Sequence, residues 1–320
     1  MCRYKHSLHL FALLGGVLLS LGGCAPASST GEELPLPPAP AVTLLLSAEA
    51  TAGDEADLPE EYAILNLSIF MADAGDEAIT DKYVYQSSVA VSSPSPDCLG
   101  CRQVKLPLDP AALARKDIYV IANYDNIAQL NAVQTVADLQ ALTTSRLRNE
   151  VRLSTTRGLP MYGESLDIDL TDTASDPPHI RLARTCAKIQ VDLLFTDASW
   201  IGTNNYFRVE NVAPYTYFVP NADFSISVTD LIEYPQVFLN QQTGSPQCFS
   251  GVAYIYESTR VPHITLYTVV GGKAREYVLS TNFPLPTRNR MYHILVEIYP
   301  PLPGATRGGE GEIQVSSVLK

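Results

Sequence analysis

The residue with the clearest chemistry in this sequence is a cysteine close to the N-terminus. A basic start is followed by a mostly apolar run over residues 8–21, two glycines and then Cys24. This order is that of a secretory signal, and the run is shorter than the roughly 20 apolar residues that span a bilayer. Small residues before a cysteine let a lipoprotein signal peptidase approach the backbone. We therefore predict cleavage between Gly23 and Cys24, followed by acylation of the Cys24 thiol.

Two alternatives to lipidation stay open: an ordinary cleaved signal with a chance cysteine, and a short helical anchor. With lipidation, residues 1–23 form the lipoprotein signal peptide. Several acyl chains, at about 0.8 kcal/mol per buried methylene, then give stable attachment to a membrane. Residues 24–41 are rich in proline and small residues, a composition typical of a semi-extended tether.

Four other cysteines remain in the exported chain: Cys98, Cys101, Cys186 and Cys248. An even number in an exported protein is compatible with disulfides. The Cys-Leu-Gly-Cys spacing of Cys98 and Cys101 would also suit a redox pair or half of a metal site. It follows a Ser/Pro-rich loop, however, and no second Cys or His pair stands at short spacing. A local disulfide between Cys98 and Cys101, or two free thiols, is the preferred interpretation.

Catalytic motifs are missing from the sequence, including those of metalloproteases, nucleophile elbows, P-loops and dinucleotide sites. Asp167 and Asp169 share one face of a predicted strand, with Glu164 nearby. They could bind calcium, but a solvated strand face is the simpler interpretation. The remaining histidines are expected to be packed or surface residues: His179, His263 and His293. We expect no enzyme, cofactor or metal, and a net charge of −12 without a basic patch argues against nucleic acid.

β patterns dominate the segments that must position these residues. Runs with partly alternating apolar residues are separated by Gly, Pro, Asp and Ser clusters at intervals of roughly 8–12 residues, which favours β-sandwiches. Helical spacing is confined to Pro110–Lys116 and Val133–Thr143. The predicted strands are residues 42–48, 62–71, 83–91, 118–124, 151–153, 161–170, 180–195, 206–212, 224–228, 251–256, 264–270, 274–279 and 292–299.

The length of 320 residues suggests two domains, at roughly 100–200 residues each. We place the boundary near residue 185, which gives an N-terminal sandwich over residues 42–184 and a C-terminal one over residues 185–320. The first strand of the N-terminal domain carries Val42, Leu44 and Leu46 at alternate positions.

A flexible segment followed by a single strand is predicted at the C-terminal end of the sequence. A Pro/Gly-rich segment over residues 300–311 precedes a strand-like segment over residues 312–320. Such a strand can pair with its own domain or add to the sheet edge of another chain. The residues predicted to serve a donated strand are Ile313, Val315, Val318 and Leu319.

Four segments together resemble the fimbrillin family of Bacteroidia-type (type V) pili, most closely its anchor or accessory subunits. They are the Leu-Pro-Met-Tyr-Gly run at 159–163, the Arg184 to Val191 segment, the Tyr254 to Ser258 strand end, and the Arg-Asn-Arg-Met-Tyr run at 288–292. The resemblance covers most of residues 42–300. It implies two transthyretin-like β-sandwich domains in tandem and a place in a fimbrium.

The resemblance also implies an assembly mechanism. Precursors travel as lipoproteins, and shaft subunits are cut after a basic residue near the N-terminus. This releases the first strand, and the groove it leaves is filled by the C-terminal strand of a neighbouring subunit. Partners would then be other fimbrial subunits through strand exchange, and outer-membrane lipid through acylated Cys24.

This sequence departs from the shaft pattern in one respect. No lysine or arginine lies between Cys24 and Lys82, so an arginine-specific protease has no site near the first strand. We expect a surface-exposed outer-membrane lipoprotein that keeps its first strand and anchors the pilus. The alternatives are a shaft or tip subunit matured by another protease, and a surface glycan-binding lipoprotein that uses Trp200 and the aromatic segment 215–218.

Overall fold

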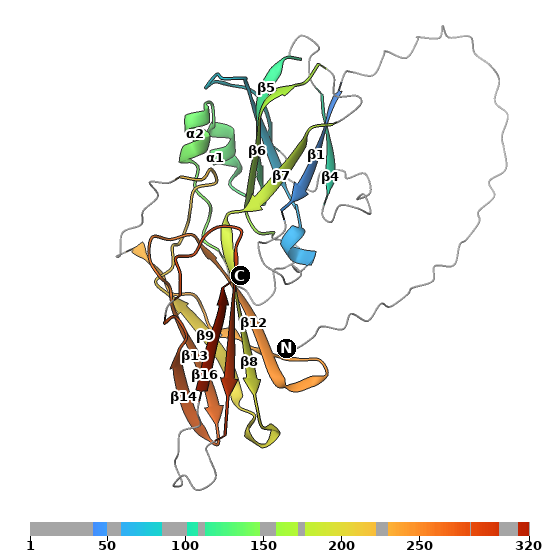
Figure 1. Cartoon of the computed structure of the whole chain (residues 1–320). Coiled ribbons are helices and arrows are strands. Elements are labelled where there is room, and N and C mark those ends of the chain that lie inside the picture. The colour runs from blue at the N-terminus through green and yellow to red at the C-terminus, as the bar shows by residue number, and fades with distance from the viewer. Residues whose placement is uncertain are drawn as a thin grey trace, which may run out of the picture. The chain divides into compact units, whose positions relative to one another are not determined.

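The computed structural model describes residues 41–49, 59–84, 101–107, 113–147, 158–171, 177–221, 230–281, 283–300 and 313–319. Strands make up most of these segments (Figure 1), so the prediction of a mainly β fold is confirmed. Residues 40–320 form one compact unit, and the division into domains at residue 185 stays a prediction. In these described segments, no helix combines the length and the apolar character needed to span a bilayer.

Seven strands before Thr185 form one sheet in the order β3-β2-β5-β6-β7-β1-β4. Strands β6 and β7 pair at only two positions, so the sheet can turn there. Leu44 and Leu106, on one side of this turn, share an apolar core with Ile69 and Ile118 on the other, which is the layering of a β-sandwich. The strands are β1 Ala41–Ala48, β2 Leu67–Asp73, β3 Ile79–Val84, β4 Arg102–Pro107, β5 Arg115–Ala122, β6 Met161–Asp169 and β7 His179–Arg184.

Strand β2 separates this core from a second one. Ile69 belongs to the sandwich core, whereas Phe70 on the opposite face belongs to another buried cluster. That cluster also contains Leu130 of α1 (Ile127–Ala132) and Leu139 of α2 (Val136–Ala141). The two short helices therefore cover the face of β2 that would otherwise expose apolar side chains.

The helix predicted over Val133–Thr143 is shorter in the structure, where α2 covers only its middle. Thr135 caps α2: the Thr135 hydroxyl accepts from the Asp138 N–H, and the Asp138 carboxylate accepts from the Thr135 N–H. Four apolar residues stand at threefold spacing in this segment: Val133, Leu139 and Leu142 are buried, and Val136 is half-buried. Helix α1 was not predicted.

The helix predicted over Pro110–Lys116 is wrong at its C-terminal end. Arg115 and Lys116 begin β5 instead, and residues 108–112 lie outside the described segments. Strand β5 pairs with both β2 and β6 and is buried from Lys116 to Ala122. Tertiary pairing on two sides therefore overrides the local helical preference of this segment.

The strands after Thr185 form two further sheets, a four-stranded one in the order β10-β9-β13-β14 and a five-stranded one in the order β11-β12-β8-β15-β16. Phe207 and Leu266 of the first sheet share one core with Val191, Ile255 and Ile294 of the second. The strands are β8 Cys186–Phe195, β9 Thr203–Glu210, β10 Val237–Phe238, β11 Asn240–Gln242, β12 Ser245–Tyr256, β13 His263–Val270, β14 Lys273–Val278, β15 Met291–Ile298 and β16 Ile313–Leu319; two 3-10 turns are η1 Pro59–Tyr62 and η3 Ala198–Trp200.

Several strand predictions differ from the structure. The strand predicted over residues 180–195 is divided at buried Thr185 into β7 and β8. Strands β4, β10 and β11 were not predicted. The segments 151–153 and 224–228, and residues 85–91 of the strand predicted to begin at Tyr83, lie outside the described residues.

Candidate functional site

Strand β1, drawn in blue in Figure 1, lies inside the seven-stranded sheet rather than at its edge. Its residues 41–46 pair antiparallel with β4, and its residues 45–48 pair parallel with β7. The N–H of Leu45 also donates to the Pro178 carbonyl at 2.9 Å, and the N–H of Glu49 donates to the Leu182 carbonyl at 2.9 Å. Without β1, both neighbouring strands would present unpaired edges.

The side chains predicted to serve the first strand point into the core. Val42 is 2% exposed, and Leu44 and Leu46 are fully buried, whereas Thr43 and Leu45 between them are half-buried. Burial of such a side chain contributes about 1.5–3 kcal/mol. The groove that β1 fills is therefore apolar at alternate positions and lined by main-chain groups on both sides.

We expect Leu44→Ala to lower the free energy of unfolding by about 2–5 kcal/mol, because it leaves a cavity in the sandwich core. Leu45→Ala, at a half-buried position on the other face, is the matched control and should cost clearly less. Urea denaturation of both variants measures the difference. Equal losses would show that alternate burial along β1 does not govern its contribution.

The last strand, β16, lies at the edge of the five-stranded sheet. Its backbone pairs antiparallel with β15, from Ile313 opposite Ile298 to Leu319 opposite Tyr292. The strand expected at the end of the chain is thus present and pairs within its own chain. The structure describes the backbone of β16 but not the side chains of Ile313, Val315, Val318 and Leu319. That another subunit uses these side chains stays a prediction.

A buried ionic cluster joins the turn η1 to strands β8 and β12, and we call it the Glu61 cluster. The Lys188 ammonium lies 3.0 Å from the Glu61 carboxylate, and the Tyr254 hydroxyl donates to the same carboxylate. The Arg184 guanidinium donates through Nε to the Glu61 main-chain oxygen at 3.0 Å. All four side chains are at most 7% exposed. Burial and the adjacent Glu61 charge raise the pKa of Tyr254, so its hydroxyl remains a donor.

A second ion pair holds the segment after β9 against the start of β15. Arg288 donates through Nε to Glu257 at 3.1 Å and through its other nitrogens to the carbonyls of Phe218 (2.8 Å) and Tyr217 (3.1 Å). Thr216 donates to the same Glu257 carboxylate at 2.9 Å. The guanidinium thus satisfies two loop carbonyls as well as a carboxylate, which fixes the loop in one conformation.

The segments that carry the family resemblance therefore meet in space, although they lie far apart in the sequence. Pro160 of the first accepts from the N–H of Thr185 at 2.9 Å, and Cys186 accepts from the N–H of Asn289 at 2.8 Å. Glu257 and Arg288, from the third and fourth segments, form the ion pair just described. The sequence pointed to each of these segments but not to the contacts between them. It gave no sign of Glu61, which belongs to no motif or periodic pattern.

Residues 41–183 match a protein family described as "Major fimbrial subunit protein (FimA)". Over these residues, which are fewer than half of the chain, the sequence is similar to a family of fimbrial subunits, in agreement with its resemblance to the fimbrillins of Bacteroidia-type pili. Fimbrial subunits assemble with one another into a cell-surface fimbrium.

Solved structures extend the likeness in fold beyond residue 183. The tip fimbrial protein Mfa3 from Porphyromonas gingivalis, with a C-terminal truncation, has a TM-score of 0.55 at 16% identity; the match covers 87% of this chain and 99% of that chain. A fimbrial assembly protein from Parabacteroides distasonis has a TM-score of 0.52 at 16% identity and covers 87% and 94%. No curated protein matches this sequence.

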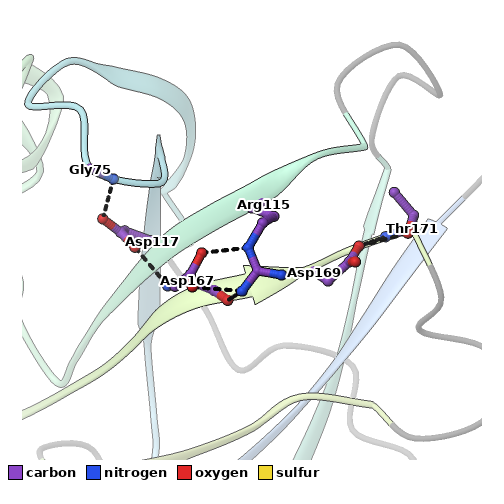
Figure 2. Close-up of polar contacts among 6 residues, drawn as sticks. All are labelled: Gly75, Arg115, Asp117, Asp167, Asp169 and Thr171. Carbon is purple, nitrogen blue, oxygen red and sulfur yellow. Dashed lines mark hydrogen bonds and ion pairs between the residues drawn. The ribbon is translucent and has the colours of Figure 1, made fainter.

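The carboxylates considered for calcium make hydrogen bonds or ion pairs with other residues of this chain (Figure 2). Asp167 forms a two-pronged ion pair with Arg115, at 2.5 and 2.6 Å, which lowers the Asp167 pKa. Two hydrogen bonds from Thr171 lower the pKa of Asp169. Glu164 accepts from the Tyr162 hydroxyl at 2.5 Å. Within the described segments, no group of three potential metal ligands comes together.

Asp167 owes its position to a bend in β6. Its φ is +57°, in the left-handed region, and its N–H donates to the Asp117 carboxylate at 2.7 Å. The other oxygen of Asp117 accepts from the Gly75 N–H at 3.1 Å (Figure 2). These contacts tie the ends of β2, β5 and β6 together, a structural use of acids that alternation alone cannot reveal.

The three histidines in the described segments have ordinary hydrogen-bond partners. His179 lies 2.8 Å from the Ser47 hydroxyl of β1, and His293 lies 2.8 Å from the Asp192 carboxylate. His263 lies 3.5 Å from the Ser280 hydroxyl, a long contact. These placements agree with the expectation of packed or surface residues.

Two of the four cysteines considered for disulfides can be placed relative to each other. Cys186 and Cys248 are both buried but lie opposite Tyr256 and Leu194, at the two ends of the β8–β12 ladder. Eight residues along a strand span about 27 Å, so these thiols cannot join in a disulfide. Cys101 is buried and disulfide-bonded. Its predicted partner Cys98 lies outside the described residues, as do Gly23 and Cys24.

The aromatic residues considered for glycan binding are mostly packed. Phe218 is fully buried against Tyr124, with ring centroids 4.9 Å apart. Trp200 is partly buried against the C-terminal core. Tyr215, at 39% exposed, is the outermost of the set. The residues thus do not share one exposed face.

Proposed function

We propose that this fimbrillin anchors a pilus to the outer membrane, with lipid on Cys24 and with its first strand retained in the fold. The observation that carries the proposal is the absence of lysine and arginine between Cys24 and Lys82. According to the family resemblance, shaft subunits lose lipid and first strand together by a cut after a basic residue. Here no such residue separates Cys24 from β1.

The position of β1 supports the same conclusion. The strand is paired on both sides and buries Val42, Leu44 and Leu46, so β1 fills the groove between β4 and β7. An anchor has no subunit below it and needs no open groove. Its own last strand can be donated upward, because β16 lies at a sheet edge and follows the Pro/Gly-rich segment 300–311.

The test is the mass of the mature protein in pili purified together with outer membrane. The anchor proposal predicts a chain that begins at Cys24 and carries acyl chains, and it predicts that Cys24→Ser sheds pili into the medium while the subunit still folds. A mature chain that lacks both lipid and residues 41–48 would overturn the proposal and favour a shaft or tip subunit matured by another protease.

A further inference from the structure

The segment that follows β1 is held at two points by side chains from β7, from the C-terminal sheets and from the turn before β15. The first point is Glu49, directly after β1, whose carboxylate accepts from the Asn289 side-chain amide at 3.2 Å. The second point is Glu61 in η1, held by Lys188 and Tyr254 through its carboxylate and by Arg184 through its main-chain oxygen. Both points lie between β1 and β2 in the sequence, yet their partners belong to β7, β8, β12 and the approach to β15.

Asn289 is well placed to hold Glu49. Its φ of +54° lies in the left-handed region, which asparagine tolerates better than most residues. Its N–H donates to the Cys186 carbonyl at 2.8 Å, and its side-chain oxygen accepts from Arg184 Nη1 at 3.1 Å. The amide nitrogen is thereby turned toward Glu49, so the side chain connects β1 to the start of β15.

Arg184 links the two points. It donates through Nε to the Glu61 carbonyl and through Nη1 to Asn289, and its guanidinium carbon lies 5.4 Å from the centre of the Tyr62 ring. At 3% exposed, this charged side chain has its hydrogen bonds directed by the fold rather than shared with water.

We infer that Arg184, Asn289 and the Glu61 cluster form a latch through which the C-terminal sheets hold the first strand in place. The latch makes retention of β1 depend on residues about 240 positions away along the chain. Linkage between two sites is reciprocal, so the latch also acts in the opposite direction. Withdrawal of β1 releases Glu49 from Asn289 and loosens the start of β15, the strand that pairs with β16. The inference concerns how β1 is held, and it stands whether or not the protein is an anchor.

Hydrogen exchange on the full mature chain tests the latch with a matched pair of variants. Asn289→Gly removes the side chain but keeps the left-handed backbone. Asn211→Gly makes the same change at an exposed asparagine with φ +60° in another turn. We expect Asn289→Gly to speed exchange of the β1 amides by about fivefold, the size of one lost hydrogen bond, and Asn211→Gly to leave them unchanged.

The amides of β9 and β13 serve as an internal reference for global unfolding. Faster exchange in β1 with an unchanged reference supports the latch. Exchange that rises equally everywhere, or only at residues near 289, overturns it. Glu49→Ala provides a second check: if the two residues act through their contact, the combined Glu49→Ala/Asn289→Gly variant should exchange no faster in β1 than the more affected single variant.

Discussion

Thr51→Arg should convert the retained subunit into one that loses its lipid and its first strand. The substitution places a basic residue between β1 and the rest of the fold, where the natural sequence has none from Cys24 to Lys82. An arginine-specific protease should then cut after residue 51, and the fragment that carries Cys24 and β1 would be joined to the subunit only by noncovalent contacts. We expect most pili to appear in the medium, as measured by the ratio of released to cell-bound fimbriae.

Thr51→Gln is the matched control, because it alters size and polarity without adding a protease site, and it should leave pili attached. The cut alone does not require β1 to leave, since ten pairing positions and four buried apolar side chains still hold it. Cleaved subunits whose pili stay attached, with fragment 24–51 still bound, would show that noncovalent retention of β1 is sufficient. Uncleaved subunits that shed pili would contradict an anchor held through Cys24.

Lys188→Met, a change in the Glu61 cluster, is expected to destabilise the fold strongly. The Glu61 carboxylate would remain buried without its cation, and breaking a buried ion pair from one side costs about 3–5 kcal/mol. Chemical denaturation measures the loss. The double variant Glu61→Gln/Lys188→Met should regain most of it, because a neutral amide can still accept from Tyr254 and no carboxylate is left buried without its cation.

Arg115→Met is the control for this comparison. Its ion pair with Asp167, at 2.5 Å, is shorter than the 3.0 Å pair of Lys188 with Glu61, but both side chains are more than half exposed. Water screens such a pair, so its loss should be far smaller. Equal losses for Arg115→Met and Lys188→Met would mean that burial does not set the strength of the Glu61 cluster.

The first strand was predictable because its signal is local. Val42, Leu44 and Leu46 alternate within one uninterrupted run, and the structure gives β1 nearly the same bounds as the sequence does. Strand β4 escaped prediction because it offers only Val104 and Leu106 among polar and charged residues, although the same alternation buries both. Two apolar positions are too few to separate a strand from a loop before its partner is known.

The Glu61 cluster and the Glu257–Arg288 ion pair were not predictable, because they depend on contacts between residues distant in the sequence. Lys188 and Glu61 are 127 positions apart, and Glu61 is one acid in a Pro-Glu-Glu-Tyr run without any periodic pattern. The family resemblance pointed to Arg184, Glu257 and Arg288, but nothing in the sequence indicates which acid each would meet. Burial decides that, and burial is a property of the assembled sheets.

The placement of β1 between two partners also determines how the strand would resist a pull. A force that enters at Ala41 along the strand axis is opposed by the hydrogen bonds to β4 and β7 simultaneously, since both ladders run along β1. The bonds are then sheared together and cannot open one by one, as they would at a peeled edge strand. A tether of residues 24–41, as the sequence predicts, would thus join the fold at a point where tension is shared among many hydrogen bonds.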